Sequence, residues 1–304
     1  MIDSLPQKYK RDIEVLVESY GASQSLHDYI SAKQVKYFPK LLGENRIRDV
    51  DWSEDQHVAH GTQHLMNGYP LLERGYAKRI IEDRPEELAR SASTFGRLSY
   101  WWGTRDECDD FLYHANDILR TLASGDIALL ERYTAVTPPT VKTGPRAEKL
   151  LHTGVTAVVS RDRERLAGAI AEYETWKKPK KHISCMYATL KGLLDSDPTQ
   201  VARGLDSFIE TSRKIYQLYD LFEYICLEPH GLYELCRWYD VDSISEFNPE
   251  RILPWDNGLY EWVRSNEGKC PHYNVESLSP TLQDWLVQLP FRDELAHHWP
   301  DDVG

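Results

Sequence analysis

The chain has 304 residues, of which 41% are hydrophobic and 28% are charged, a composition typical of a folded globular protein. Its 48 acidic and 36 basic side chains give a formal net charge of −12, which disfavours nucleic acid as a partner unless a local basic face overrides it. No apolar run reaches the roughly 18 residues of a membrane span, and the first residues lack a secretory signal pattern. We therefore expect a cytoplasmic protein with no membrane partner.

Helical signals follow one another along the first part of the chain. Apolar residues recur at helical spacing, and glycine and proline interrupt them. Gly68 and Pro70 predict a break, Gly103 predicts a helix end, and Thr104 with Glu107 predicts a capping box. The helices expected here cover residues 6–20, 25–41, 55–82, 83–102, 104–122 and a short stretch from 125 to 133.

The second part of the chain is again predicted to be helical throughout. Residues 137–145 hold three prolines and a glycine, which predicts a Pro-rich connection between an N-terminal half, 1–136, and a C-terminal half, 146–304. We expect the two halves to form one continuous helical body. The helices expected here cover residues 146–159, 162–176, 182–194, 198–216, 217–239 with a candidate division at Pro229, and a short last helix that begins at Ser279 and Pro280.

Three of these helices begin in nearly the same way. Aligned on their first apolar residue, each has alanine next, an apolar residue four positions on and an aromatic residue seven positions on. The second and third copies lie about 35 residues apart, close to the period of helix–turn–helix repeats. This predicts an all-α fold of stacked antiparallel helical pairs, a tetratricopeptide-like superhelical array; three ordinary amphipathic helices that begin alike are the alternative. The aligned positions are Leu88, Ala92 and Phe95; Leu166, Ile170 and Tyr173; and Val201, Leu205 and Phe208.

Catalytic signatures are missing from the sequence. His57, His60 and His64 share one helical face and are weak candidates for a metal site, but a polar helix face explains them as well. The sequence has no nucleophile elbow, phosphate-binding loop or dinucleotide fingerprint, and its five cysteines are scattered. We therefore expect no cofactor, no metal and no enzymatic activity.

Two acidic segments are candidates for partner binding. The first stands at a predicted helix start, where helix capping is the other explanation for its carboxylates. The second is rich in tyrosine, and aromatic side chains beside carboxylates are typical of interface hot spots. The one basic cluster, 177–181, is interrupted by proline and is expected to be a solvated turn. The candidate binding residues are Asp106, Glu107, Asp109 and Asp110 in the first segment, and Tyr219, Asp220, Glu223, Tyr224, Glu228 and Tyr233 in the second.

Three further segments give the chain a family resemblance. They are Ser160-Arg-Asp-Arg-Glu-Arg-Leu166, Cys226-Leu-Glu-Pro-His-Gly-Leu-Tyr-Glu-Leu235 and Leu253-Pro-Trp-Asp256. Over roughly residues 85–260 the chain resembles the immunity protein 49 family of bacterial polymorphic toxin systems. The resemblance implies an immunity protein that binds a cognate toxin, expected to be basic, and neutralises it by occlusion without catalysis. Pro229 and His230 depart from the family pattern, so no residue-level role is carried over.

Two other functions fit the sequence. A helical-repeat scaffold would hold a host peptide or protein in its groove, although the Trp, Leu-Gly and Tyr pattern of true tetratricopeptide repeats is missing. A metal-dependent enzyme would use His57, His60 and His64. Ionic strength separates the first two functions, because binding of a basic toxin should weaken steeply with added salt and binding of a peptide in apolar pockets should not.

Overall fold

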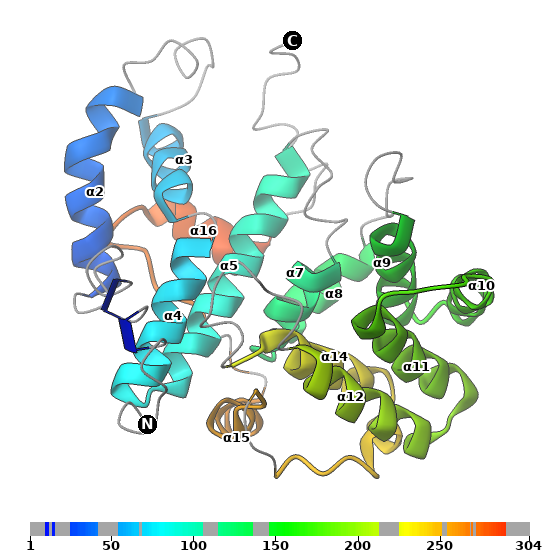
Figure 1. Ribbon diagram of the computed structural model, residues 1–304. Coiled ribbons are helices and arrows are strands. Elements are labelled where there is room, and N and C mark those ends of the chain that lie inside the picture. Colours follow the sequence, from blue (N-terminus) through cyan, green and yellow to red (C-terminus); the bar gives the residue numbers. More distant parts are fainter. Residues whose placement is uncertain are drawn as a thin grey trace. The chain divides into compact units, whose positions relative to one another are not determined.

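The fold is all-α, as predicted. A computed structural model describes residues 10–11, 14–15, 25–41, 54–66, 69–105, 115–135, 146–212, 225–250, 254–267, 269 and 272–289 (Figure 1). Every regular element within these ranges is a helix. None of the helices in them combines the length and apolar character needed to cross a membrane. The chain divides into two compact units, unit 1 with Met1–Cys108 and Pro271–Gly304, and unit 2 with Asp109–Cys270.

Unit 1 consists of helices that pack in pairs. Helix α4 lies against α5, α2 lies against α3, and α16 contacts both α3 and α5 (Figure 1). The C-terminal helix α16 is therefore part of the N-terminal unit. The bounds are α2 (Leu26–Leu41), α3 (Glu54–Met66), α4 (Tyr69–Glu82), α5 (Pro85–Arg105) and α16 (Pro280–Gln288).

One predicted boundary in unit 1 is confirmed and one is wrong. The long helix expected over residues 55–82 is divided, since α3 ends at Met66 and α4 begins at Tyr69. Helix α5, however, continues through Gly103 and Thr104 to Arg105, so neither the predicted helix end nor the predicted cap is present there. A glycine inside a helix costs only about 1 kcal/mol relative to alanine, which the rest of this long helix offsets.

Helix α5 supplies the core of unit 1 and its link to the C-terminal segment. The predicted apolar positions of its first turns, Leu88, Ala92 and Phe95, are all buried. The Tyr273 hydroxyl lies 3.0 Å from a Glu87 carboxylate oxygen, to which it donates. Further along α5, the Arg97 guanidinium is buried and donates to the Leu286 carbonyl of α16. Polar contacts inside the core therefore fix residues near the C-terminus to α5.

The described part of unit 2 is also helical. The helix predicted over residues 146–159 has those bounds, and Asp162 caps the next helix by accepting from the Arg165 amide. The predicted connection, 137–145, lies within the span of unit 2 and outside the described residues. The bounds are α7 (Ala115–Leu122), α8 (Ile127–Ala135), α9 (Arg146–Val159), α10 (Arg163–Glu174), α11 (Lys181–Asp195), α12 (Pro198–Ser212), α14 (Leu227–Tyr239), the 3-10 helix η2 (Val241–Ile244) and α15 (Asn257–Ser265).

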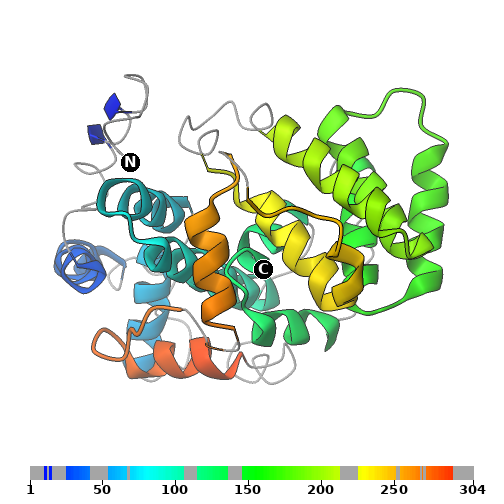
Figure 2. The same cartoon turned by 90° about the horizontal axis from the view of Figure 1, so that it is seen from below.

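Helices α11 and α12 form a close antiparallel pair, and they run side by side in Figures 1 and 2. Gly192 of α11 lies against Val201 of α12, and Gly204 of α12 lies against Thr189 of α11. Contacts that move back along one helix as they advance along the other define antiparallel packing. A Cβ on Gly204 would stand 2.7 Å from the Thr189 backbone nitrogen, so glycine sets how near the two helices come.

The repeated helical stripe is buried except at one residue. Leu166 and Ile170 of α10 and the three α12 positions Val201, Leu205 and Phe208 are at most 5% exposed. Tyr173 is half-buried and stacks on Tyr187, with ring centroids 3.8 Å apart. Both α10 and α12 pack against α11. The superhelical array remains a prediction, because α7 also pairs with α14, from a distant part of the chain, whereas repeat units contact their sequence neighbours.

The helix predicted over residues 217–239 has a different start. Helix α14 begins at Leu227, and Ile225 and Cys226 before it are not helical. Pro229 is the third residue of α14 and does not divide it. In the first turn of a helix the backbone N–H has no acceptor within the helix, so proline loses no hydrogen bond there.

Candidate partner-binding surface

Glu228, one of the predicted binding residues, lies inside unit 2. Its Oε1 accepts from Arg120 Nε of α7 at 2.6 Å, and Arg120 also forms an ion pair with Asp117 at 2.6 Å. The Cys226 thiol lies 3.1 Å from Oε2 of the same carboxylate, and burial raises the pKa of this thiol far above its usual value. Glu228 is 2% exposed, so the structure uses this carboxylate to join α14 to α7, and it offers no surface to a partner.

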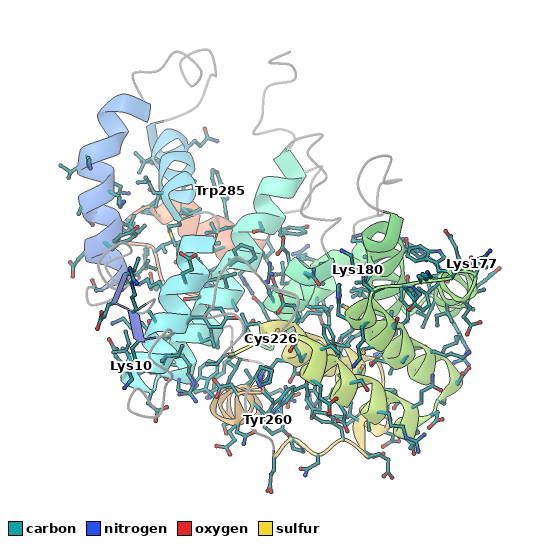
Figure 3. All side chains as sticks on the ribbon, viewed as in Figure 1. Lys10, Lys177, Lys180, Cys226, Tyr260 and Trp285 are labelled. Carbon is teal, nitrogen blue, oxygen red and sulfur yellow. The ribbon has the colours of Figure 1, made fainter. Side chains whose placement is uncertain are left out.

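Tyr233, a second predicted binding residue, is also internal. Its ring belongs to an aromatic cluster in unit 2 and packs within 6 Å of Phe247, Trp255 and Tyr260. Tyr260 comes from α15, which lies beside α14 in both views (Figures 1 and 2), and Figure 3 labels it together with Cys226. Because Tyr233 is 5% exposed, almost all of its surface contacts the core of unit 2 and little of it can contact a partner.

His230 lies at the centre of the same region. Its ring stacks on Trp255 at 3.8 Å, and its Nε2 accepts from the Asp256 amide at 3.0 Å. Burial lowers the pKa of His230 from 6.5 to about 4, against the opposing effect of the Asp256 carboxylate. The imidazole is therefore neutral at physiological pH. It serves as an acceptor that fixes residues 254–256 against α14, where the Cys226 amide also donates to the Pro254 carbonyl.

Two ion pairs lie next to this cluster, and one of them joins α14 to α15. Arg264 of α15 donates to the buried Glu234 carboxylate, and Arg237 of α14 pairs with Glu267 at 2.7 Å. Burial raises the pKa of Glu234 from 4.5 to about 7, and the Arg264 guanidinium opposes that rise. Glu234 therefore gains a proton near neutral pH, which an exposed carboxylate does not.

Acidification is expected to act on stability through these two groups in opposite directions. With a folded pKa of about 4, His230 binds its proton more readily in the unfolded chain, so stability falls as the pH drops from 6.5 to 4. With a folded pKa of about 7, Glu234 binds its proton more readily in the folded chain, so stability rises as the pH drops from 7 to 4.5. The two contributions offset each other between pH 6.5 and 4.5.

Glu234→Gln is expected to remove one side of this balance. Between pH 6.5 and 4.5 the free energy of unfolding of the variant should fall by about 2 kcal/mol more than that of the unsubstituted chain, because only the His230 contribution remains. Urea unfolding at both pH values measures this difference. Glu261→Gln, an exposed substitution on α15, is the control and should follow the unsubstituted chain. If the Glu234→Gln curve runs parallel to that of the control, the Glu234 carboxyl does not titrate in this range.

Residues 238–250, which we call the acidic edge, form an exposed surface after α14. The carboxylates of Asp240, Asp242, Glu246 and Glu250 are exposed, and the segment contains no basic residue. The Asp240 side chain caps η2 by accepting from the Asp242 amide, and the Ser243 hydroxyl donates to the Asp240 carbonyl. These hydrogen bonds order residues 240–243 at the start of the edge.

One apolar side chain stands out on the acidic edge. Val241 is 62% exposed between the carboxylates of Asp240 and Asp242. Phe247 of the same segment is buried and packs on Trp255, which anchors the edge to the aromatic cluster. Sequence reasoning missed this surface, although four carboxylates and no basic residue within residues 238–250 were a visible signal.

The remaining predicted binding residues cannot be compared with this surface. Tyr219, Asp220, Glu223 and Tyr224 lie outside the described residues. The same holds for the first acidic segment, Asp106, Glu107, Asp109 and Asp110. Both sets therefore remain predictions.

His57, His60 and His64 are placed on α3 by its backbone, and their side chains lie outside those that the structure describes. Among the described residues, no three histidine, cysteine, aspartate or glutamate side chains gather in a way that could hold a metal ion. Cys185, Cys226 and Cys236 are free and buried. The described part of the chain thus offers an acidic surface and no assembled metal site.

The segments that carry the family resemblance meet at α14. Arg161, from the first, donates to the Trp238 carbonyl at 3.1 Å and stacks over the Trp238 ring. Residues 254–256, from the third, pack on the start of α14. Comparison of the chain with protein-family models, curated proteins and solved structures finds no match.

Proposed function

We propose that this chain is a cytoplasmic immunity protein, which binds a basic cognate toxin and neutralises it by occlusion without catalysis. The observation that carries the proposal is the acidic edge, because its four exposed carboxylates and the exposed Val241 suit a cationic partner. The chain's net charge of −12 adds long-range attraction for such a partner. The resemblance to the immunity protein 49 family supports the same function.

Charge and shape have separate roles in this proposal. Long-range attraction raises the rate of encounter, and complementary charges at contact set the orientation. Val241 adds apolar area to an otherwise polar contact. The hydrogen bonds of η2 order Val241 and Asp242 before a partner binds, which lowers the entropy cost at these two residues. Occlusion of a toxin's active site needs no reactive group on the immunity protein.

The test of the function is protection of cells. Co-expression of the chain with the polypeptide encoded next to its gene should restore growth if that polypeptide is the cognate toxin, and the two should co-purify. Absence of both protection and complex formation contradicts the proposal. Complex formation that is insensitive to salt would favour the peptide-binding scaffold, because apolar pockets depend little on ionic strength.

Charge reversal is expected to slow toxin binding at two places. Asp220→Lys with Glu223→Lys tests the predicted tyrosine-rich hot spot, and Asp242→Lys with Glu246→Lys tests the acidic edge. Each pair should lower the association rate constant by roughly tenfold or more at low salt and leave the melting temperature nearly unchanged, because long-range steering is lost while the core is intact. Surface plasmon resonance at several ionic strengths measures the rates.

The control for both pairs is Glu172→Lys with Glu210→Lys, which reverses two exposed charges elsewhere in unit 2. If the control slows association as much as the other pairs, only net charge matters and the chain has no localised binding face. If Asp220→Lys with Glu223→Lys unfolds the protein, these carboxylates are structural, and the binding face is elsewhere.

A further inference from the structure

The loop between α10 and α11 concentrates positive charge on a negatively charged chain. Lys177, Lys178, Lys180 and Lys181, which we call the lysine loop, are all exposed. Figure 3 labels Lys177 beyond the end of α10 and Lys180 at the start of α11. Within the described residues, none of the four ammonium groups forms an ion pair or a hydrogen bond. These four cations are therefore available to an external anion.

The start of α11 adds to the positive potential of the loop. Lys180 occupies the N-cap position and makes no side-chain hydrogen bond to the first turn. The first amides of a helix point away from it and carry a partial positive charge, which an anion stabilises. Most helix starts satisfy these amides with serine, threonine, aspartate or asparagine, whereas this one places a lysine there.

The aromatic residues on either side hold the loop in place. Tyr173, near the end of α10, stacks on Tyr187 of α11, and its hydroxyl donates to the Ser184 hydroxyl at 2.7 Å. Trp176 packs on the Tyr173 ring at 5.8 Å. Both ends of the lysine loop are thus fixed to the helical pair. The rings are used in this packing, so they are not free to stack on a ligand.

Carboxylates near the loop offset part of its charge. Glu174 is paired with Lys191 of α11, and Glu172 and Glu210 are the other exposed carboxylates on the adjoining turns of α10 and α12. The acidic edge is remote, because Arg161, at the opposite end of α10, is the residue that contacts Trp238. The 12 residues of α10 span about 18 Å, roughly twice the Debye length of about 8 Å at physiological ionic strength.

We propose that the lysine loop binds the phosphate backbone of nucleic acid, without reading its sequence. A duplex carries about one negative charge per 1.7 Å of its axis, so it can offer a phosphate to each of the four ammonium groups of the loop. Lysine acts as a compact point charge on phosphate, whereas the planar guanidinium of arginine imposes a fixed bidentate geometry. The loop supplies the local basic face that overrides the unfavourable net charge. This site is separate from the acidic edge and does not depend on the proposed immunity function.

Two other anionic partners fit the loop less well. Stable binding to a membrane surface needs an apolar anchor in addition to a few lysines, and no large apolar side chain of this loop is exposed. An acidic peptide must lose conformational entropy on binding, which four solvated ion pairs without apolar pockets do not offset. A stiff polyanion such as duplex nucleic acid loses much less conformational entropy on binding.

The experiment measures how the affinity depends on salt. Fluorescence anisotropy of a fluorescein-labelled 20-bp DNA duplex, titrated with the complete chain, should show an affinity that falls about 100-fold between 50 and 200 mM salt, as expected for four phosphate contacts. Lys177→Ala with Lys178→Ala leaves two contacts, so the affinity should fall only about tenfold over the same range. Far-UV circular dichroism should show the same melting temperature for both proteins.

The matched control is Arg203→Ala with Lys269→Ala, which removes two other exposed cations of unit 2 and gives the same net charge. It should bind the duplex with the salt dependence of the unsubstituted chain. The proposal is overturned if the duplex does not bind at 50 mM salt, or if the control loses as much salt dependence as the loop variant. Equal or tighter binding to vesicles with anionic lipid, or to polyglutamate, would also overturn it.

Discussion

Gly231→Ala is expected to destabilise unit 2 by more than about 3 kcal/mol. Gly231 lies on α14 where this helix crosses α7, and an added Cβ would stand 1.7 Å from the Leu119 carbonyl oxygen. The atoms that this Cβ would meet are backbone atoms of Leu119, so no side-chain rotation can relieve the overlap. The two helices would have to move apart. Separation would also stretch the buried Arg120–Glu228 ion pair. Urea unfolding of the complete chain, followed by circular dichroism, measures the effect.

A second glycine provides the control for this prediction. Gly168 lies on the exposed side of α10, and a Cβ there would meet no atom within 4 Å. Gly168→Ala should therefore stabilise the protein by about 0.5–1 kcal/mol through helix propensity alone. If Gly231→Ala instead matches the stability of the unsubstituted chain, α7 and α14 do not cross as closely as the structure describes.

Local signals explain most of the helical segments that sequence reasoning predicted. The N-caps of α10 and α16 depend on Asp162 and Ser279, each of which accepts from an amide three residues later. The helical period of apolar residues also puts Leu166 with Ile170, and Val201 with Leu205, on one face of their helices, and the structure buries all four. Such features need only neighbouring residues, so the sequence displays them directly.

Pairings between distant segments were not predictable in the same way. Helix α14 packs on α7, although Arg120 and Glu228 are 108 residues apart. Helix α16 likewise joins unit 1, at the other end of the chain from most of its helices. Nothing in helical periodicity identifies which helix a given face will meet. Periodicity therefore does not reveal that residues 271–304 belong with residues 1–108.

Burial of the candidate binding residues also depended on distant segments, which the sequence does not identify. Glu228 and Tyr233 looked like an exposed acidic and aromatic surface, because carboxylates are usually solvated. Their burial depends on Arg120 for the carboxylate and on Trp255 and Tyr260 for the ring, and these partners come from other elements. The acidic edge, in contrast, is exposed, and within it the Asp240 side chain caps η2 through a contact only two residues away.

Phe208→Ala is expected to destabilise the protein by about 3–5 kcal/mol, the range found when a packed core aromatic is truncated. Phe208 of α12 has no exposed surface and ends the third copy of the helical stripe, beside Leu205. The loss is a large part of the 5–15 kcal/mol that holds a typical domain together.

Arg203→Ala, on the exposed side of α12, controls for the helix itself and should change stability by less than about 0.5 kcal/mol. Equilibrium urea unfolding at neutral pH compares the Phe208→Ala and Arg203→Ala variants. A loss below about 1 kcal/mol for Phe208→Ala would mean that its ring is poorly packed. The three shared helix starts would then belong to ordinary amphipathic helices. A repeated stripe of buried residues stabilises a fold only where neighbouring side chains fill the space around it.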